Sequence, residues 1–321
     1  MTKREFVLKG LNNEETLGAP VGLWFHHLPE ERWGDGLTDP EVLELNINGH
    51  KKFIREFRPD FVKIMSDGFF FPPAAPVREV SDLNSIEEAG SNHEWIEKQV
   101  YLVKQVCGTD RDLAYFYNIF SPLTTLRFMI GAERLLSFIA SSPESVSKAV
   151  CSLGTTLSRL AGRVISEGGA DGIYFSVQNP DIERISDDFY AACFSSADLL
   201  VLNAAGGEES NNILHICGYD GVRNRLPAWK SYPAKAYNWA VNVEGVSLKE
   251  GKELFSGKAV IGGFANPKGS LIDSGRREEI IRFVKTLLEE TGRRGVIIGA
   301  DCTVTPDLAP ERLDWIREGA V

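Results

Sequence analysis

Short apolar runs alternate with longer amphipathic segments along the whole chain. A short apolar run bounded by polar residues or glycine is typical of a buried strand. Eight such runs are present, at 20–25, 60–66, 112–120, 170–177, 211–217, 237–243, 258–265 and 295–301. Between them, 130–165 and 277–291 are amphipathic, which predicts helices, and 130–165 carries a capping-type Ser-Ser-Pro-Glu at 141–144 in its middle.

Strands that alternate with helices predict a parallel sheet. Eight parallel strands are the number that closes a (β/α)8 TIM barrel, and this α/β barrel is the fold class that we expect. The rival is an open doubly wound sheet, whose nucleotide-binding versions lose support because the chain lacks G-x-G-x-x-G and the P-loop motif. No low-complexity linker, charge block or short repeat divides the sequence, so 1–321 is predicted to be a single barrel domain.

The composition is that of a globular protein, and it narrows the possible partners. Of 321 residues, 43% are hydrophobic and 25% are charged, and the net charge is −10. Nucleic acids and anionic membranes both favour basic patches, so we expect neither as a partner. No apolar run approaches the ~20 residues of a membrane span, and MTKREFVLKG lacks a signal-peptide core, so a cytoplasmic protein is expected.

The five cysteines, at 107, 151, 193, 217 and 302, are few, scattered and odd in number. This pattern is not a disulfide framework. In a reducing compartment such thiols remain free to bind a metal.

The strongest chemical signal is NNILHICGYD, at the end of the fifth run. Alternate side chains of a strand point to the same face, so His215 and Cys217 are predicted to lie side by side. Cys302 ends the eighth run, and in a barrel it would meet them at the carboxyl ends of the strands. One imidazole and two thiolates suit a catalytic zinc with one open position. Spacing alone leaves the alternative open that these are ordinary buried residues.

Polar residues follow several of the other runs. His26 and His27 follow the first run and are candidates for substrate contact, although paired histidines are also common in ordinary loops. Ser176 and Asn179, at the fourth run, are possible polar contacts of the same kind. Arg127, after the third run, is a candidate for binding a carboxylate or sulfonate, or else it is a residue of a helix surface.

Aromatic residues gather around the second and third runs, as Phe69-Phe70-Phe71 and Tyr115-Phe116, with Trp24 in the first. We predict that they pack in the core rather than form a binding cage. They still leave room for an apolar substrate.

The sequence HICG at 215–218, followed by GADC at 299–302, resembles the H-x-C-x(n)-C zinc motif of corrinoid-dependent methyltransferases. These are enzymes of the methylcobamide:coenzyme M methyltransferase type, in the uroporphyrinogen decarboxylase superfamily, and cobalamin-independent methionine synthases have a similar arrangement. The chain also resembles the family in its first helix and strand, in a later helix and strand, and in its closing loop and helix. The corresponding segments are MTKREFVLKGLNNEETLGAPV, VEGVSLKEGKELFSGKAVIGGFANPKGSL and CTVTPDLAPERLDWI. The resemblance implies a barrel with an N-terminal helical extension, and zinc held by His215, Cys217 and Cys302.

The same superfamily contains decarboxylases, and two segments bear on the choice. Where uroporphyrinogen decarboxylases carry R-Q-A-G-R for the substrate carboxylates, this chain has WFHHLPEERW. A polyanionic substrate would therefore meet an acidic protein without those charges. KIMSDGFFFPP does resemble the decarboxylase segment F-S-D-I-L, which places Asp67 at the position of the catalytic aspartate. In a methyltransferase Asp67 would support the residues of the site or anchor the substrate, and the alternative is a capping or turn aspartate before Gly68.

The resemblance implies methyl transfer between a corrinoid and a thiol or other heteroatom. The methylcobamide would arrive on a separate corrinoid carrier protein, because this chain has no D-x-H-x-x-G corrinoid motif. Glu244 resembles an acidic residue after the family's sixth strand, and is the candidate catalytic residue and fourth zinc ligand, or else a loop glutamate. Asp301 and Asp220 are candidates for a hydrogen bond to His215, or else plain loop residues.

Two other functions stay open at this point. One is a decarboxylase-like enzyme that acts on a tetrapyrrole, and the other is a non-catalytic barrel that binds zinc or a tetrapyrrole. A structural zinc site usually has four ligands from local loops, so ligands from two distant strands favour a catalytic site. Access to the metal distinguishes a catalytic zinc from a structural one, because a catalytic zinc should accept an added thiol and a structural zinc should not.

Overall fold

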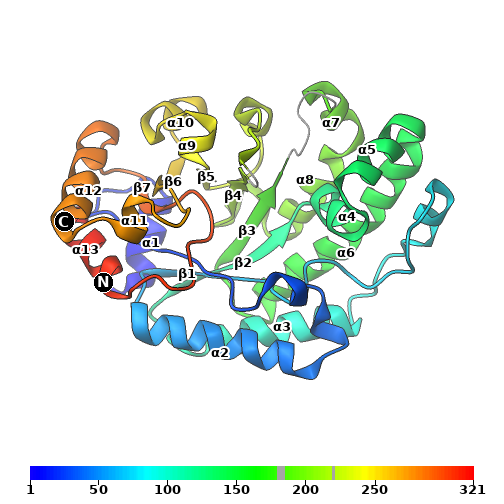
Figure 1. The fold of residues 1–321 in the computed structure, drawn as a ribbon, viewed down its shortest axis with the longest axis horizontal. Helices are drawn as coiled ribbons and strands as arrows, with labels where there is room; N and C mark the ends of the chain where they lie inside the picture. The colour runs from blue at the N-terminus through cyan, green and yellow to red at the C-terminus, as the bar shows by residue number, and fades with distance from the viewer. Residues whose placement is uncertain (179–184, 219–220) are drawn as a thin grey trace.

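A curled sheet of seven parallel strands forms the centre of the protein in a computed structural model, which describes residues 1–178, 185–218 and 221–321 (Figure 1). The strands pair in chain order, each with the next. They are β1 Phe61–Ile64, β2 Ala114–Phe120, β3 Gly172–Val177, β4 Ile213–Ile216, β5 Ala236–Trp239, β6 Ala259–Phe264 and β7 Val296–Ala300. Helices surround the sheet, so the architecture is an α/β barrel-like fold.

The predicted first strand, 20–25, is not a regular strand. Val21 makes one parallel bridge with Ile298 of β7, and the Gly22 N–H donates to the Ile298 carbonyl. On its other side, the Val21 N–H donates to the carboxylate of Asp60, just before β1. The Val21 carbonyl in turn accepts from the Asp60 main-chain N–H at 3.0 Å, and among the described residues no strand ladder with β1 forms. The expected eight-stranded barrel is therefore seen as seven strands and a bridging segment.

Thirteen α-helices connect and cover the strands in the described part of the chain. They are α1 Lys3–Leu11, α2 Pro40–Phe57, α3 Glu94–Cys107, α4 Pro122–Ile130, α5 Ala132–Ser141, α6 Pro143–Ser166, α7 Asp187–Cys193, α8 Ser195–Ala204, α9 Val241–Glu244, α10 Leu248–Leu254, α11 Leu271–Ser274, α12 Arg277–Thr291 and α13 Glu311–Ala320. The predicted helix 277–291 is confirmed as α12. The amphipathic stretch 130–165 is divided between α5 and α6, which meet at the capping-type segment around Ser142.

The two faces of the strands build two separate cores. Residues such as Val62 and Leu214 point outward and pack beneath the helices. The inward-facing residues form a second cluster with two side chains of α1: Trp24, Phe61, Met65, Ala114, Phe116, Tyr174, Ile213, Ala236, Ala259, Ile261 and Ile297, with Val7 and Leu11. The α1 helix lies at the amino ends of β1 and β2, where the Arg4 N–H donates to the Asp112 carbonyl. One end of the interior is thus filled with apolar side chains, and any site must lie at the carboxyl ends of the strands.

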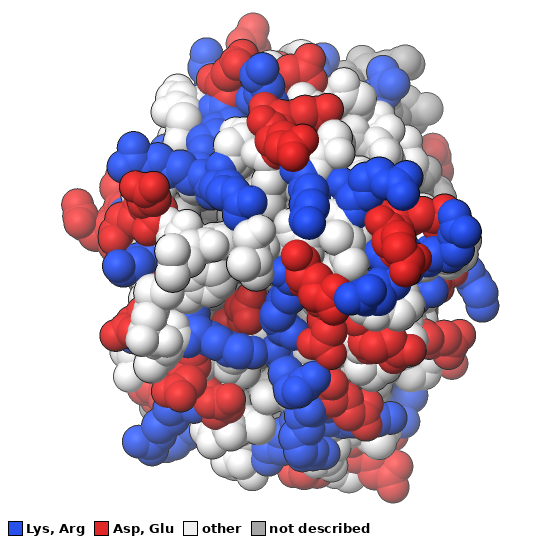
Figure 2. All heavy atoms as spheres, turned by 90° about the vertical axis from the view of Figure 1, so that its left-hand side faces the viewer, with Lys and Arg blue, Asp and Glu red and all other residues white. Residues whose placement is uncertain are grey.

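The surface carries charges of both signs. On the face that includes α12 and α13, Lys, Arg, Asp and Glu side chains are interspersed (Figure 2). Ion pairs between Arg277 and Glu318, and between Arg58 and Asp314, contribute to this mixture. Among the described residues, no helix is both long and apolar enough to cross a membrane.

Candidate metal centre

His215, Cys217 and Cys302 meet at the carboxyl ends of β4 and β7. Ile213 faces the interior, so the strand alternation carries His215 and Cys217 to the same side. The Cys217 N–H donates to the Val177 carbonyl and extends the pairing with β3 by one residue. Cys302 follows β7 and reaches the same point from the far side of the sheet. The structure thus brings together the three residues that the motif singled out.

The donor atoms of the three side chains lie close enough together to hold one metal ion. The two sulfurs lie 3.9 Å apart, the Cys302 sulfur lies 3.7 Å from His215 Nε2, and all three donor atoms are within 4.8 Å of one another. Zinc bonds of ordinary length in a tetrahedron would put two sulfurs about 3.8 Å apart, and sulfur and nitrogen about 3.6 Å apart. Two of the three distances therefore match a zinc site, and the third, between His215 Nε2 and the Cys217 sulfur, is within 4.8 Å.

Asn238 of β5 fixes the protonation of His215. The Asn238 side-chain N–H groups donate to the carbonyls of Ile261 and Ala300, at 2.9 and 3.1 Å. Its oxygen therefore faces His215 Nδ1, which must carry the hydrogen that it donates to that oxygen. The lone pair then remains on Nε2, which is the nitrogen beside Cys302. A metal-binding histidine is usually oriented in this way.

The two thiols lie within hydrogen-bond distance and affect the ionisation of each other. The hydrogen bond between them lowers the pKa of Cys302 and, together with burial, raises the pKa of Cys217. A divalent cation would favour the ionised form of both.

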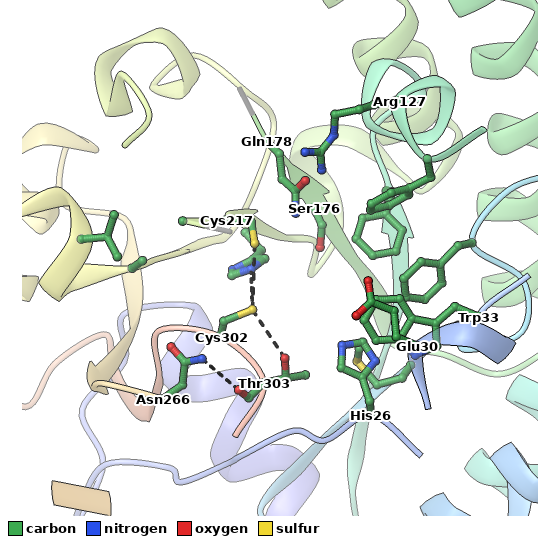
Figure 3. A pocket seen from close by; sticks show the side chains of 18 of the residues that line it. His26, Glu30, Trp33, Arg127, Ser176, Gln178, Cys217, Asn266, Cys302 and Thr303 are labelled. Carbon is green, nitrogen blue, oxygen red and sulfur yellow. Dashed lines mark hydrogen bonds between the residues drawn. The ribbon is translucent and has the colours of Figure 1, made fainter. Parts of the chain in front are cut away.

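A cavity of about 660 Å³ opens beside this centre (Figure 3). The three donor residues line one side, together with Gln178 and Asn266. The sequence predictions Ser176 and Arg127 also line it, Ser176 from β3 and Arg127 from α4. The Ser176 hydroxyl donates to the Asn118 side chain at 3.0 Å. The buried centre is therefore open to a molecule of substrate size on one side.

An aromatic wall, made by His26, Trp33, Phe70, Phe120 and Phe128, forms the other side of the cavity. Successive ring centroids lie 4.2 to 5.4 Å apart, from His26 through Trp33 to Phe70 and then to the two remaining rings. Phe70 is buried, in agreement with the core prediction, and it also borders the cavity. The sequence did not reveal that Trp33, Phe120 and Phe128 line the cavity, because they lie in separate segments that only the fold brings together.

Asp67 is fully buried beneath His26 and does not line the cavity. One carboxylate oxygen accepts from the His26 Nδ1–H at 2.8 Å, and the other accepts from the main-chain N–H groups of His27 and Leu28, at 2.7 and 3.3 Å. Its oxygens are thus occupied by the loop after the bridging segment. The contacts make Asp67 the residue that orients His26, whose ring stands at the cavity edge.

His27 and Glu244 lie away from the cavity. The His27 ring packs against His50 of α2, at 4.1 Å between centroids, and burial lowers its pKa well below the ordinary value. The Glu244 carboxylate accepts from the Asn224 main-chain N–H at 2.8 Å, and burial raises its pKa. Glu244 is not in the group of donor atoms that includes His215. The structure brings three candidate metal ligands together, His215, Cys217 and Cys302, and Glu244 does not lie with them.

The other acidic candidates do not orient His215. Asp301 accepts from the main-chain and side-chain N–H groups of Asn242, at 3.1 and 3.0 Å, and so secures the start of α9. The residue that is hydrogen-bonded to His215 Nδ1 is Asn238. Asp220 and Asn179 lie outside the described residues.

Lys63, on β1, is a cavity residue that the sequence interpretation missed. It is 4% exposed, and burial lowers its pKa to about 8. The signal was a lysine between Val62 and Ile64 in an apolar run, since a fully buried strand rarely contains one.

A scan against models of protein families found no match to this chain, and a search of curated proteins found none either. Solved structures share its fold. A methyltransferase from Methanosarcina mazei matches with a TM-score of 0.75 and 15% identity, over 99% of this chain and 98% of that chain. A B12-independent methionine synthase from Shewanella sp. W3-18-1, in complex with selenomethionine, matches at 0.61 and 11%, over 95% and 97%. An endo-1,4-β-mannanase from Eisenia fetida matches at 0.54 and 12%, over 94% and 91%.

These identities establish a shared fold and nothing finer. The mannanase has a different activity on the same architecture, so the fold does not select the chemistry. The chain is thus similar in fold to known methyltransferases, and its function must be argued from its own donor residues and cavity.

Proposed function

We propose that the protein is a zinc-dependent methyltransferase that moves a methyl group between a corrinoid carrier protein and a thiol or other heteroatom. One observation carries the proposal: the donor atoms of His215, Cys217 and Cys302 lie within 4.8 Å of one another, with the imidazole already oriented, beside a cavity of about 660 Å³. The fold likeness to two methyltransferases agrees with it.

The donor set favours a catalytic site over a structural one. Three ligands come from two distant strand ends and face a cavity, which matches the three protein ligands and open position of catalytic zinc. Bound zinc would supply a Lewis acid that stabilises a thiolate or polarises the bond to a methylated heteroatom. The two cysteine thiolates would balance the charge of that cation, which favours a soft sulfur substrate over activation of water.

The surrounding residues have distinct tasks in this reaction. Asn238 holds the His215 ring so that Nε2 faces the metal position. Asp67 holds the ring of His26 at the cavity edge. The aromatic wall would exclude water from the reacting atoms. The open side of the cavity leaves room for a corrinoid partner to approach.

The decarboxylase alternative is less well supported by the cavity. The lysine and arginine residues that line it are Lys63 and Arg127, which is a small positive charge for a substrate with many carboxylates. Arg32, in the segment that stands where the decarboxylase arginines would be, pairs with Asp39 instead. Neither the small positive charge of the cavity nor the pairing of Arg32 favours a porphyrinogen as substrate.

The test is thiol-dependent demethylation of free methylcobalamin by zinc-loaded protein, followed by absorbance. We expect turnover with at least one thiol of a panel, and a loss of about a thousandfold in Cys302→Ser, because Lewis-acid stabilisation is worth several kcal/mol. The exposed Cys151, on α6, gives the matched control, and Cys151→Ser should keep full activity. If Cys302→Ser is as active as the wild type, the proposal fails.

A further inference from the structure

The aromatic wall leaves large rings partly exposed inside the cavity. Phe70 is buried, but Trp33, Phe120 and Phe128 keep part of their surface accessible, and all four rings line the cavity. The planes of Trp33 and Phe70 differ by only 30° with 4.7 Å between the ring centroids, whereas Phe120 stands at 85° to Phe128. Stacked and edge-to-face contacts are the two arrangements that aromatic pairs prefer, so a further ring could add to this wall in either way.

Polar anchors hold two rings of the wall in place. The Trp33 Nε1–H donates to the Leu28 carbonyl at 3.1 Å, and the His26 Nδ1–H donates to the buried Asp67 carboxylate at 2.8 Å. These hydrogen bonds fix the side chains at the cavity rather than in the core. A ligand therefore meets rings that are already ordered, which lowers the entropic cost of binding.

An acceptor without a partner lies on the other side of the cavity. Gln178 directly follows β3, is 5% exposed and lines the cavity. Its amide acts as a hydrogen-bond donor to Cys217, and its side-chain oxygen is buried with no hydrogen-bond partner among the described residues. Ser176 gives its hydroxyl hydrogen to Asn118, so it too can only accept. Figure 3 shows both side chains near Cys217 and apart from Trp33. A ligand that offers a donor would satisfy the buried oxygen.

We propose that the cavity binds a hydroxylated aromatic ring, which stacks on the aromatic wall and donates its hydroxyl hydrogen to Gln178. This inference rests on the proposed function and narrows its small-molecule substrate to a phenol-like compound. An aliphatic ring would fill the same space without the electrostatic gain of aromatic pairing. An aromatic ring without a donor would leave the Gln178 oxygen buried and unpaired.

The experiment compares three probes of nearly equal size by NMR titration on zinc-loaded protein. Phenol has the ring and the donor, cyclohexanol has the donor alone, and fluorobenzene has the ring alone. Trp33→Leu removes a ring of the wall, and Gln178→Met removes the acceptor but keeps the length of the side chain. The matched controls are Trp315→Leu, at a partly exposed position of α13, and Gln105→Met, at a partly exposed position of α3.

We expect the wild type to bind phenol about 3- to 10-fold more tightly than either cyclohexanol or fluorobenzene, from the usual strength of one aromatic pairing and one hydrogen bond. Trp33→Leu should lose the preference for phenol over cyclohexanol and keep the preference over fluorobenzene. Gln178→Met should show the reverse pattern, which a general disturbance of the cavity would not produce. Both control variants should behave as wild type.

Equal affinities of the wild type for the three probes, or preferences that survive both substitutions, would overturn the inference. Circular dichroism and zinc content establish that each variant is folded and loaded, and Phe128→Leu provides a second variant of the wall. The failures can be told apart. A wild type that binds no zinc refutes the proposed function, whereas a zinc-loaded wild type that demethylates methylcobalamin but does not prefer phenol refutes this inference alone.

Discussion

At the scale of single residues, the centre depends on an amide that does not touch the metal position. Asn238 uses both of its N–H groups on main-chain carbonyls, so its oxygen can only accept, and His215 must present Nε2 to the sulfurs. The orientation is set before any metal arrives. A preorganised ligand of this kind raises metal affinity because binding does not have to select the tautomer.

Asn238→Leu should weaken zinc binding about 10- to 100-fold, the usual cost of losing such a partner. It should also lower the free energy of unfolding by about 1–3 kcal/mol, because the His215 Nδ1–H is left buried and unpaired. Competition with a chromophoric chelator measures the first effect, and urea unfolding measures the second.

The control for that change is Asn212→Leu. Asn212 precedes β4, is equally buried, and accepts from the Ile173 N–H at 3.0 Å, far along the strand from the metal centre. This variant should lose stability and keep its zinc affinity. Equal zinc affinity in wild type and Asn238→Leu would show that the amide does not orient the ligand.

Some of these residues could be predicted from the sequence and others could not. His215 and Cys217 follow from the period of a strand, which a short stretch of sequence reveals. Asn238 and Lys63 sit inside apolar runs, and only the register of neighbouring strands, such as His215 opposite Asn238, shows what they face. The sequence makes His27 a candidate for substrate contact together with His26, but consecutive residues of an extended segment point to opposite sides, and His27 packs against His50.

At the scale of elements, α2 is fastened to the end of β1 by two of its own side chains. The Asn46 side-chain N–H groups donate to the carbonyls of Met65 and Asp67, at 3.0 and 2.9 Å. His50 Nδ1 donates to the Asn46 carbonyl, and its Nε2 accepts from the Met65 N–H, both at 2.9 Å. Protonation of Nε2 as well would point a hydrogen at the Met65 N–H, so the His50 imidazole must be neutral.

This contact predicts an acid-sensitive stability. Burial lowers the pKa of His50 from 6.5 to about 4, so between these values the unfolded chain binds a proton that the folded protein refuses. Stability is therefore fully present above pH 6.5 and falls as the pH drops towards 4, by about 2 kcal/mol at pH 5 from this group. Urea unfolding of wild type and His50→Gln at pH 7 and pH 5 measures it. A wild type that loses no more stability than His50→Gln on acidification would contradict the account.

The helices also show where local sequence decides structure. The division of 130–165 at Ser142 is visible in the sequence, because Pro143 has no N–H to give to the preceding turn. The preceding break at Gly131 depends on a φ of 84°, which only the folded chain reveals. Strand 20–25 looked regular for the opposite reason, since nothing in its apolar pattern indicates that the Asp60 carboxylate takes the Val21 N–H.

At the scale of the whole molecule, the two apolar cores predict a fold that does not depend on a metal. The interior cluster and the outer core under the helices are both apolar, and the donor residues lie at one end of the interior. Fully burying each large apolar side chain contributes about 1.5–3 kcal/mol. Such cores stabilise the chain whether or not zinc is bound.

Metal-free protein should accordingly remain folded, with an unchanged far-ultraviolet circular dichroism spectrum. Its free energy of unfolding should rise by about 1.4 kcal/mol for each tenfold increase of free zinc above the dissociation constant. Thermal unfolding at several buffered zinc concentrations tests this, with Cys302→Ser as the variant that should not respond. Collapse of the spectrum on chelation would mean that the zinc is structural.

The central claim is that His215, Cys217 and Cys302 form one zinc site, and elemental analysis tests it most directly. Wild type, Cys217→Ser, Cys302→Ser and the exposed control Cys151→Ser would be purified together under metal-replete, reducing conditions. The account predicts one zinc per chain in wild type and Cys151→Ser, and loss or loosening of that zinc in the other two variants. A wild type without zinc, or a Cys217→Ser protein that keeps the full amount, would contradict it.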